Sequence, residues 1–206
     1  MASGETNASN PGDGLAALMA RARDAAGGEG RGLPPVERWN PPFCGDIDME
    51  IKADGRWFYM GTPIGRPALV RLFSTVLRKD EDGKTYLVTP VEKVGIRVSD
   101  APFLAVEMNV EGEGENQVLT VRTQLGDLVT IDADHPLRFA TTDEGGLKPY
   151  VTVRGRLEAL FTRALTQDLV GLGEVLTLNG RDMFCLRSGG AVFAVMAADE
   201  LERLSA

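Results

Sequence analysis

The feature that most constrains the fold is an internal repeat. The stretch Arg66–Arg78 (RPALVRLFSTVLR) resembles Arg154–Thr166 (RGRLEALFTRALT) at a fixed offset. The identical pairs are Arg66/Arg154, Leu69/Leu157, Leu72/Leu160, Phe73/Phe161 and Leu77/Leu165. Weaker matches join residues 51–59 to 131–139, 87–89 to 175–177 and 96–103 to 186–193. A duplicated unit predicts two tandem domains, and the interface between two copies is a favoured place for a ligand.

The apolar residues of both stretches recur at i, i+3, i+4 and i+7, which predicts amphipathic helices over 67–78 and 155–167. Each copy then reads as a β-β-α-β-β-β unit. Closely spaced strands favour antiparallel pairing, so the predicted class is α+β, with curved antiparallel sheets each packed with one helix. The predicted strands are 47–52, 56–61, 85–90, 94–98, 102–110, 117–124, 127–132, 137–141, 149–153, 174–179, 182–187 and 191–196, and a short helix covers 198–204.

The domain boundaries follow from the repeat and from composition. Residues 1–32 are expected to be a flexible N-terminal segment, disordered over 1–13 and carrying a short helix over 15–24 with an apolar stripe at Leu15, Leu18 and Met19. The Gly-rich run at 27–32 is interpreted as a linker, because no strand precedes it and no Lys-Ser/Thr pair follows it. The first repeat domain is placed at 33–116 and the second at 117–206.

Composition excludes several classes of protein. The net charge of −8 argues against nucleic acid as a partner, since phosphate neutralisation needs a basic surface. No apolar run reaches the roughly 18 residues of a membrane span, and the N-terminus lacks the features of a signal peptide. Cys44 and Cys185 are far apart, so neither a disulfide framework nor a metal site is expected. A cytoplasmic location with reduced thiols is predicted.

Familiar catalytic motifs are absent. The sequence has no GxSxG, HExxH or Walker pattern, and its one histidine, His135, falls at a predicted turn where we expect it to be solvated. Neither a catalytic residue nor a metal ligand is assigned, and the sequence identifies no cofactor.

The two arginines before the predicted helices are the sharpest indication of a site. Pro67 fits a first helical turn, which places Arg66 at the N-cap, and Arg154 repeats the arrangement. A cation there opposes the helix dipole and therefore calls for an anion. The anion could be a carboxylate of the protein, such as Asp48 or Glu92, or a ligand phosphate.

Two further sets of residues are candidates. Asp46 and Asp48 point to one face of an extended segment, where they could bind a cation or a pair of ribose hydroxyls, or could simply form the entry to a strand. Trp57 and Tyr59 share a strand face, where they could pack in the core or stack on a base.

Six motifs together resemble an uncharacterised bacterial family, domain of unknown function 1285. They are WNPPFCGDIDM (39–49), DGRWFYMGTPIGR (54–66), LVRLF (69–73), VTPVEKVGI (88–96), DAPF (100–103) and PYVTVR (149–154). The resemblance covers about residues 34–200. It implies a duplicated α+β core, a C-terminal half loosely like a pleckstrin-homology domain, and a role in signalling with a small nucleotide-like ligand between the domains. It implies no established activity.

The leading hypothesis is a non-catalytic, cytoplasmic signalling or regulatory protein with a small anionic ligand at the domain interface. A nucleotide-like molecule is one candidate for that ligand. The proposed ligand-binding residues are Asp46, Asp48, Trp57, Tyr59, Arg66, Glu92 and Arg154. One alternative is an enzyme acting on a nucleotide-like substrate, with Asp46, Asp48 and Glu92 as metal or acid/base groups. Another is an adaptor that binds protein partners through exposed strand edges.

Overall fold

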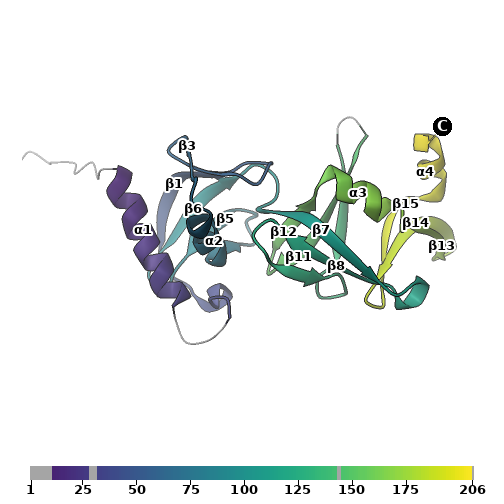
Figure 1. Ribbon diagram of the computed structural model, residues 1–206, viewed down its shortest axis with the longest axis horizontal. Helices are drawn as coiled ribbons and strands as arrows, with labels where there is room; N and C mark the ends of the chain where they lie inside the picture. The colour runs from purple at the N-terminus through teal and green to yellow at the C-terminus, as the bar shows by residue number, and fades with distance from the viewer. Residues whose placement is uncertain (1–10, 28–31, 143–144, 206) are drawn as a thin grey trace, which may run out of the picture. The chain divides into compact units, whose positions relative to one another are not determined.

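The computed structural model describes residues 11–27, 32–142 and 145–205, and the chain divides into two units (Figure 1). The first unit contains the residues up to Lys52 together with Arg56–Ser99, and the second contains Ala53–Gly55 and the residues from Asp100 onward. The expected boundary was at 116/117. The strand at Phe103–Glu111 pairs with strands of the second unit, which places the main division before it.

The first unit is built on a mixed sheet of six strands. Its order is β3-β2-β1-β6-β5-β4, and β1 and β6 run parallel at its centre while the other neighbours are antiparallel. The helix α2 (Pro67–Thr75) connects the third strand to the fourth. The strands are β1 (Phe43–Ile51), β2 (Trp57–Tyr59), β3 (Thr62–Pro63), β4 (Leu77–Lys79), β5 (Thr85–Val88) and β6 (Lys93–Val98).

The second unit repeats this strand order. Its sheet is β10-β11-β12-β7-β8-β9, again with the first strand, β7, parallel to the sixth, β12. Its strands are β7 (Phe103–Glu111), β8 (Val118–Thr123), β9 (Leu128–Thr130), β10 (Leu137–Thr141), β11 (Leu147–Arg154) and β12 (Leu157–Phe161). A helix, a three-stranded sheet and a last helix follow: α3 (Arg163–Val170), β13 (Glu174–Leu178), β14 (Arg181–Ser188), β15 (Ala191–Ala197) and α4 (Ala198–Ser205).

The prediction of a duplicated α+β fold is therefore confirmed, but the composition of the repeat was wrong. Each of the two repeated sheets has six strands and is mixed, because its first and last strands pair in parallel at the centre. The fourth and fifth strands show the true correspondence: Arg78 lies opposite Tyr86 in one sheet, and Arg138 lies opposite Tyr150 in the other.

The helix predicted over 155–167 was also wrong. Gly155, with a φ of 51°, turns the chain after β11, and Leu157, Ala159 and Phe161 alternate as buried residues of β12. The helix α3 begins only after its N-cap, Thr162. A short apolar run such as LEALF satisfies both a period of two and a period of 3.6, so periodicity alone could not separate strand from helix. Arg66–Arg78 and Arg154–Thr166 consequently form different elements.

The core of the first unit lies between α2 and the sheet. Trp57 of β2 and Phe73 of α2 are both buried and stack with their ring centroids 6.4 Å apart. The Pro-rich segment before β1 is tied to the same unit by buried Arg78, which donates to the carbonyl oxygens of Val36 (2.9 Å) and Trp39 (2.7 Å). The short helix η1 (Val36–Arg38) lies in this segment.

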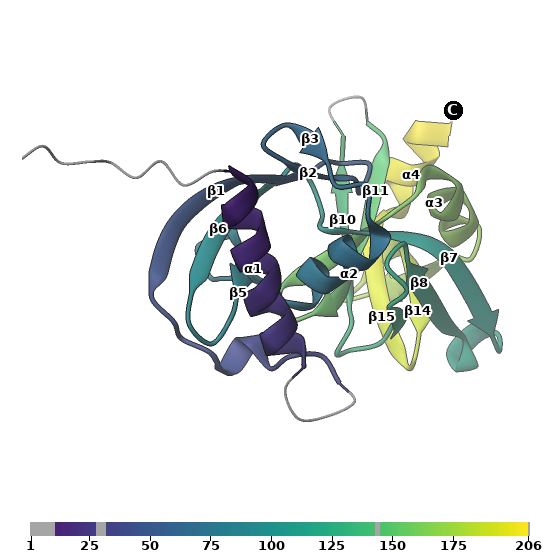
Figure 2. The same cartoon turned by 60° about the vertical axis from the view of Figure 1, so that its left-hand side comes forward.

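The N-terminal helix α1 (Pro11–Ala26) belongs to the first unit and packs against α2 (Figures 1 and 2). It buries Leu18, Ala22 and Ala25, and Arg21 forms an ion pair with Glu92. Residues 11–13 were expected to be disordered but form the first turn of this helix. The rest of the expected disordered segment, 1–10, and most of the expected linker lie outside the described residues.

No helix in the described part of the chain combines the length and the apolar character needed to cross a membrane.

Candidate functional site

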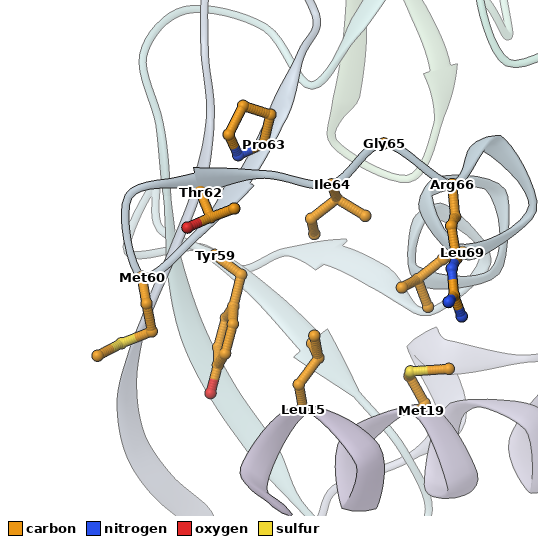
Figure 3. A pocket seen from close by; sticks show the side chains of 10 residues that line it. All are labelled: Leu15, Met19, Tyr59, Met60, Thr62, Pro63, Ile64, Gly65, Arg66 and Leu69. Atoms are coloured by element: carbon orange, nitrogen blue, oxygen red, sulfur yellow. The ribbon is translucent and has the colours of Figure 1, made fainter. Parts of the chain in front are cut away.

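A pocket of about 390 Å³ lies within the first unit, between α1, the β2–β3 hairpin and the beginning of α2 (Figure 3). Its lining residues are Leu15, Met19, Tyr59, Met60, Thr62, Pro63, Ile64, Gly65, Arg66 and Leu69. Most of these side chains are apolar, and the one charge among them is the guanidinium of Arg66. Apolar walls with a single oriented polar group are typical of sites for small molecules.

The hairpin that forms one wall depends on an unusual turn. Met60 and Gly61, which join β2 to β3, have φ values of 50° and 72°. Two successive positive φ values are characteristic of the tight turns that match the twist of paired strands, although a methionine rarely adopts them. The Met60 amide donates to the Asp48 carbonyl oxygen (2.8 Å), which fixes the turn against β1.

The opposite wall is α1. Figure 3 shows Leu15 and Met19 rising from this helix toward Ile64 and Leu69. Gly14 allows the close approach, because a Cβ at this position would lie 3.3 Å from the Tyr59 hydroxyl. Leu15 and Met19 belong to the apolar stripe that the sequence predicts for this helix, and both line the pocket, whereas Leu18 of the same stripe is buried. The sequence did not predict that this stripe lines a site.

Arg66 is at the N-cap of α2, as predicted, with an extended backbone (φ −102°, ψ 104°) and Pro67 at the start of the helix. The helix has no side-chain cap and no acidic residue in its first turn. The Arg66 side chain is exposed, extends beside Leu69 toward α1 (Figure 3), and makes no hydrogen bond or ion pair with any residue in 11–27, 32–142 or 145–205. The positive helix end and the guanidinium thus lie together without a counter-charge from the described chain.

The two carboxylates expected to pair with Arg66 are held by other arginines. Asp48 accepts from Arg97 at 2.6 Å on the exposed face of β1. Glu92 is buried and pairs with Arg21 of α1, a contact that raises the pKa of the Arg21 guanidinium through the hydrogen bond and the charge of Glu92.

Asp46 shares the exposed face of β1 with Asp48, in line with the sequence pattern. Its carboxylate covers Gly95 on the neighbouring strand, where a Cβ would lie 2.0 Å from the Asp46 Oδ1 atom. Within the described ranges, no three acidic, cysteine or histidine side chains form a group that could hold a metal ion. Asp46, Asp48 and Glu92 are therefore not gathered into a metal centre.

Trp57 and Tyr59, which share a face of β2, have different surroundings. Trp57 is 2% exposed and packs against Phe73, so its ring belongs to the core of the unit. Tyr59, two residues further along the strand, lines the pocket.

Arg154 does not repeat the position of Arg66, and the prediction that it precedes a helix was wrong. It ends the strand β11, donates to Asp127 at 2.9 Å, and lies over the ring of Phe103, 4.9 Å from the centroid. Burial lowers the pKa of the Arg154 guanidinium, against the opposing effect of Asp127. Thr123 also donates to Asp127 (2.9 Å), so this arginine is part of a structural ion pair.

Two other features of the chain carry polar groups that could form a site. His135, expected to be solvated, is half-buried, and its Nδ1 atom lies 3.0 Å from the carbonyl oxygen of Thr152.

A second pocket of about 220 Å³ is lined by Asp48, Glu50, Lys52, Phe58, Gly61 and Arg97. Its charges neutralise one another, because Arg97 pairs with Asp48 and Lys52 lies 3.5 Å from Glu50. It is therefore less suited to an anion than the pocket beside Arg66.

These features define the class of the protein: a tandem α+β protein with two six-stranded mixed sheets and a largely apolar pocket in its first unit. Residues 34–101 match the model of the N-terminal domain of the DUF1285 family, and residues 102–195 match the model of its C-terminal domain. The chain belongs to this family of unknown function, as its motifs predicted.

Two solved structures resemble this chain. A DUF1285 family protein from Silicibacter pomeroyi DSS-3 is 50% identical, with a TM-score of 0.80, over 90% of this chain and 98% of that one. A DUF1285 family protein from Shewanella baltica OS155 is 29% identical, with a TM-score of 0.47, over 60% of this chain and 90% of that one. No match was found among curated proteins. The likeness of the C-terminal half to a pleckstrin-homology domain stays a prediction.

Proposed function

We propose that this protein is a non-catalytic binding protein with a regulatory role, and that its ligand is a small anionic molecule held in the pocket beside Arg66. The observation that carries the proposal is the charge of this pocket: its one charged lining residue is a cation with no partner in the described chain. The proposal places the ligand within the first unit, whereas the sequence led us to expect it between the two domains.

The electrostatic setting supports an anion over a cation or a neutral molecule. The chain as a whole carries a net charge of −8, yet no carboxylate lines this pocket. The N-terminus of α2, which Gly65 and Arg66 bring to the same place, adds the partial positive charge of a helix end. A carboxylate or phosphate bound here would receive both contributions.

The regulatory part of the proposal rests on α1. This helix supplies Leu15 and Met19, while the sheet and α2 supply the remaining lining residues. A ligand that contacts both walls stabilises the docked arrangement of α1 by its differential affinity for that state. The ligand could in this way control whether α1 stays on the unit.

The alternative of an enzyme receives less support from this site. The lining contains no carboxylate, histidine or cysteine, so it lacks the usual groups for general acid–base or nucleophilic catalysis. A nucleotide-like ligand remains a candidate anion at this point and is included in the test.

A thermal-shift screen followed by calorimetric titration tests the proposal. The panel contains inorganic phosphate, AMP and aliphatic and aromatic carboxylates, each measured with the parent chain, Arg66→Gln and Arg71→Gln. Arg71 is the matched control because it is also exposed, lies on the same helix and does not line the pocket. Removing the charge-assisted hydrogen bonds of Arg66 should weaken binding roughly ten- to a hundredfold, which corresponds to about 1.5–3 kcal/mol.

The Arg71→Gln variant should bind like the parent chain. Equal binding by all three proteins, or no stabilisation by any anion of the panel, would contradict the proposal.

A further inference from the structure

We propose that the ligand is an amphipathic monocarboxylate of medium chain length, whose aliphatic part lies between α1 and the β2–β3 hairpin and whose carboxylate meets Arg66. This inference names the ligand class for the site described above, and so it rests on the proposed function. It goes further by excluding nucleotides, the class that the sequence suggested first.

The residues that line the pocket favour an apolar chain in the ligand. Leu15, Met19, Ile64, Leu69 and Pro63 present aliphatic and thioether surface, and the polar side chains among the lining residues other than Arg66 are Tyr59 and Thr62. A nucleotide would bring ribose hydroxyls and the edge of a base into this space. Each such group that loses water without gaining a hydrogen bond weakens binding, so an alkyl chain fits the lining better.

The head group follows from the cation. A guanidinium presents two parallel N–H donors that match the planar geometry of a carboxylate. One arginine and one helix end balance a single negative charge, whereas a phosphate monoester would leave part of its charge without a partner among the lining residues. Arg66 lies at one end of the apolar lining, so the charged head and the apolar tail can be satisfied together (Figure 3).

The size of the pocket limits the chain. A volume of about 390 Å³ is near the lower end of the range for small-molecule sites, roughly 300–1,000 Å³. We therefore expect a medium-length chain to fill it and longer chains to gain little more.

A homologous series tests this ligand class. Butyrate, hexanoate, octanoate and decanoate are titrated into the parent chain by calorimetry, beside octanamide as the uncharged counterpart of octanoate, AMP and inorganic phosphate. Affinity should rise about fourfold for each added methylene until the pocket is filled, the equivalent of ~0.8 kcal/mol per methylene. The stoichiometry should be one, and octanamide should bind at least tenfold more weakly than octanoate.

A variant on α1 tests the location. Met19→Glu places a carboxylate in the pocket opposite Arg66, where it competes with the ligand head group and should abolish octanoate binding. Ala17→Glu adds the same charge at an exposed position of the same helix and should leave binding unchanged. Circular dichroism and thermal unfolding show whether both variants fold. Arg66→Gln, which alters no helix interior, is a second test of the same site.

The outcomes separate the two proposals. If AMP or phosphate binds in an Arg66-dependent way and the alkyl carboxylates do not, the ligand class is overturned while the proposed function stands. If no anion binds, both fail. If octanoate binds equally to the parent chain, Met19→Glu and Arg66→Gln, it is held elsewhere as a detergent, and the inference is again overturned.

Discussion

The two six-stranded sheets share one strand order but differ in how the third strand is connected to the fourth. In the first unit this connection contains α2, and its N-terminus forms one end of the pocket. In the second unit the connection between β9 and β10 has no helix and is a short turn containing His135. The comparison teaches that the duplicated sheet is a scaffold, and that the candidate site depends on elements added to one copy.

The arginines show the same division. Arg154 is held in the second unit by Asp127 and Phe103, whereas Arg66 in the first unit has no carboxylate partner in the described chain. Arg154 therefore stabilises the fold, and Arg66 is available to a ligand. Substitutions in the two units should therefore differ in their effect on stability.

The packing of α2 on the first sheet should contribute most. Phe73 is fully buried against Trp57, so Phe73→Ala should lower the free energy of unfolding by about 3–5 kcal/mol. Urea denaturation followed by tryptophan fluorescence measures the loss, because Trp57 lies beside the substituted ring. A loss below about 1 kcal/mol would show that α2 is not a core element of its unit.

The ion pair of the second unit should have the next largest effect. Arg154→Ala leaves the half-buried Asp127 without its guanidinium partner and should cost about 1–3 kcal/mol in chemical denaturation. The double variant Arg154→Ala/Asp127→Ala completes a double-mutant cycle. If its loss equals the sum of the two single losses, the pair has no coupling energy and Arg154 is not the structural arginine of this comparison.

The shared tyrosines predict a loss of stability at alkaline pH. The hydrogen bond from its hydroxyl to Asp82 raises the pKa of Tyr86 to about 12, and burial together with a hydrogen bond to Asp100 raises the pKa of Tyr150. An unfolded tyrosine ionises near pH ~10. Because the folded pKa is the higher one, the stabilisation is complete below about pH 10 and is lost as the pH rises toward about 12.

Tyr86→Phe should flatten this alkaline decline, which denaturation curves recorded across the same pH range would measure. Tyr150→Phe tests the equivalent strand of the second sheet. A decline that is unchanged in both variants would mean that neither hydroxyl contributes to the pH dependence.

The smallest effect on stability is expected for Arg66. Its guanidinium forms no hydrogen bond or ion pair within the described ranges, so Arg66→Ala should change the free energy of unfolding by no more than about 0.5 kcal/mol in the absence of ligand. Arg71→Ala on the same helix is the reference. A loss comparable to that of Arg154→Ala would remove the distinction between the two arginines.

Sequence reasoning reached the duplicated α+β fold, most of the strands and the N-cap position of Arg66, because these depend on local patterns. The sequence comparison paired the wrong residues of the two copies. Equivalent residues, such as Arg78 and Arg138 on the fourth strands, are identified by the order of the strands in each sheet. That order depends on the long-range parallel pairing of the first and sixth strands, which leaves a weak local signal. The stronger sequence match joined Leu157 and Phe161 of a strand to Leu69 and Phe73 of a helix.

The candidate site was predicted only in part. Arg66 and Tyr59 were named from the sequence, but Leu15 and Met19 were read as the stripe of a short helix in a flexible segment. Their contribution could not be predicted, because the docking of α1 depends on tertiary contacts such as the pair between Arg21 and Glu92. Glu92 was predicted to bind the ligand, because its burial beside α1 cannot be recognised from the neighbouring sequence.

The most direct test of the central claim is a crystal structure of the chain with bound octanoate. The account predicts the carboxylate about 2.7–2.9 Å from the guanidinium nitrogens of Arg66, with the alkyl chain between Leu15, Met19 and Ile64. An octanoate bound elsewhere, or one whose carboxylate points away from Arg66, would contradict it.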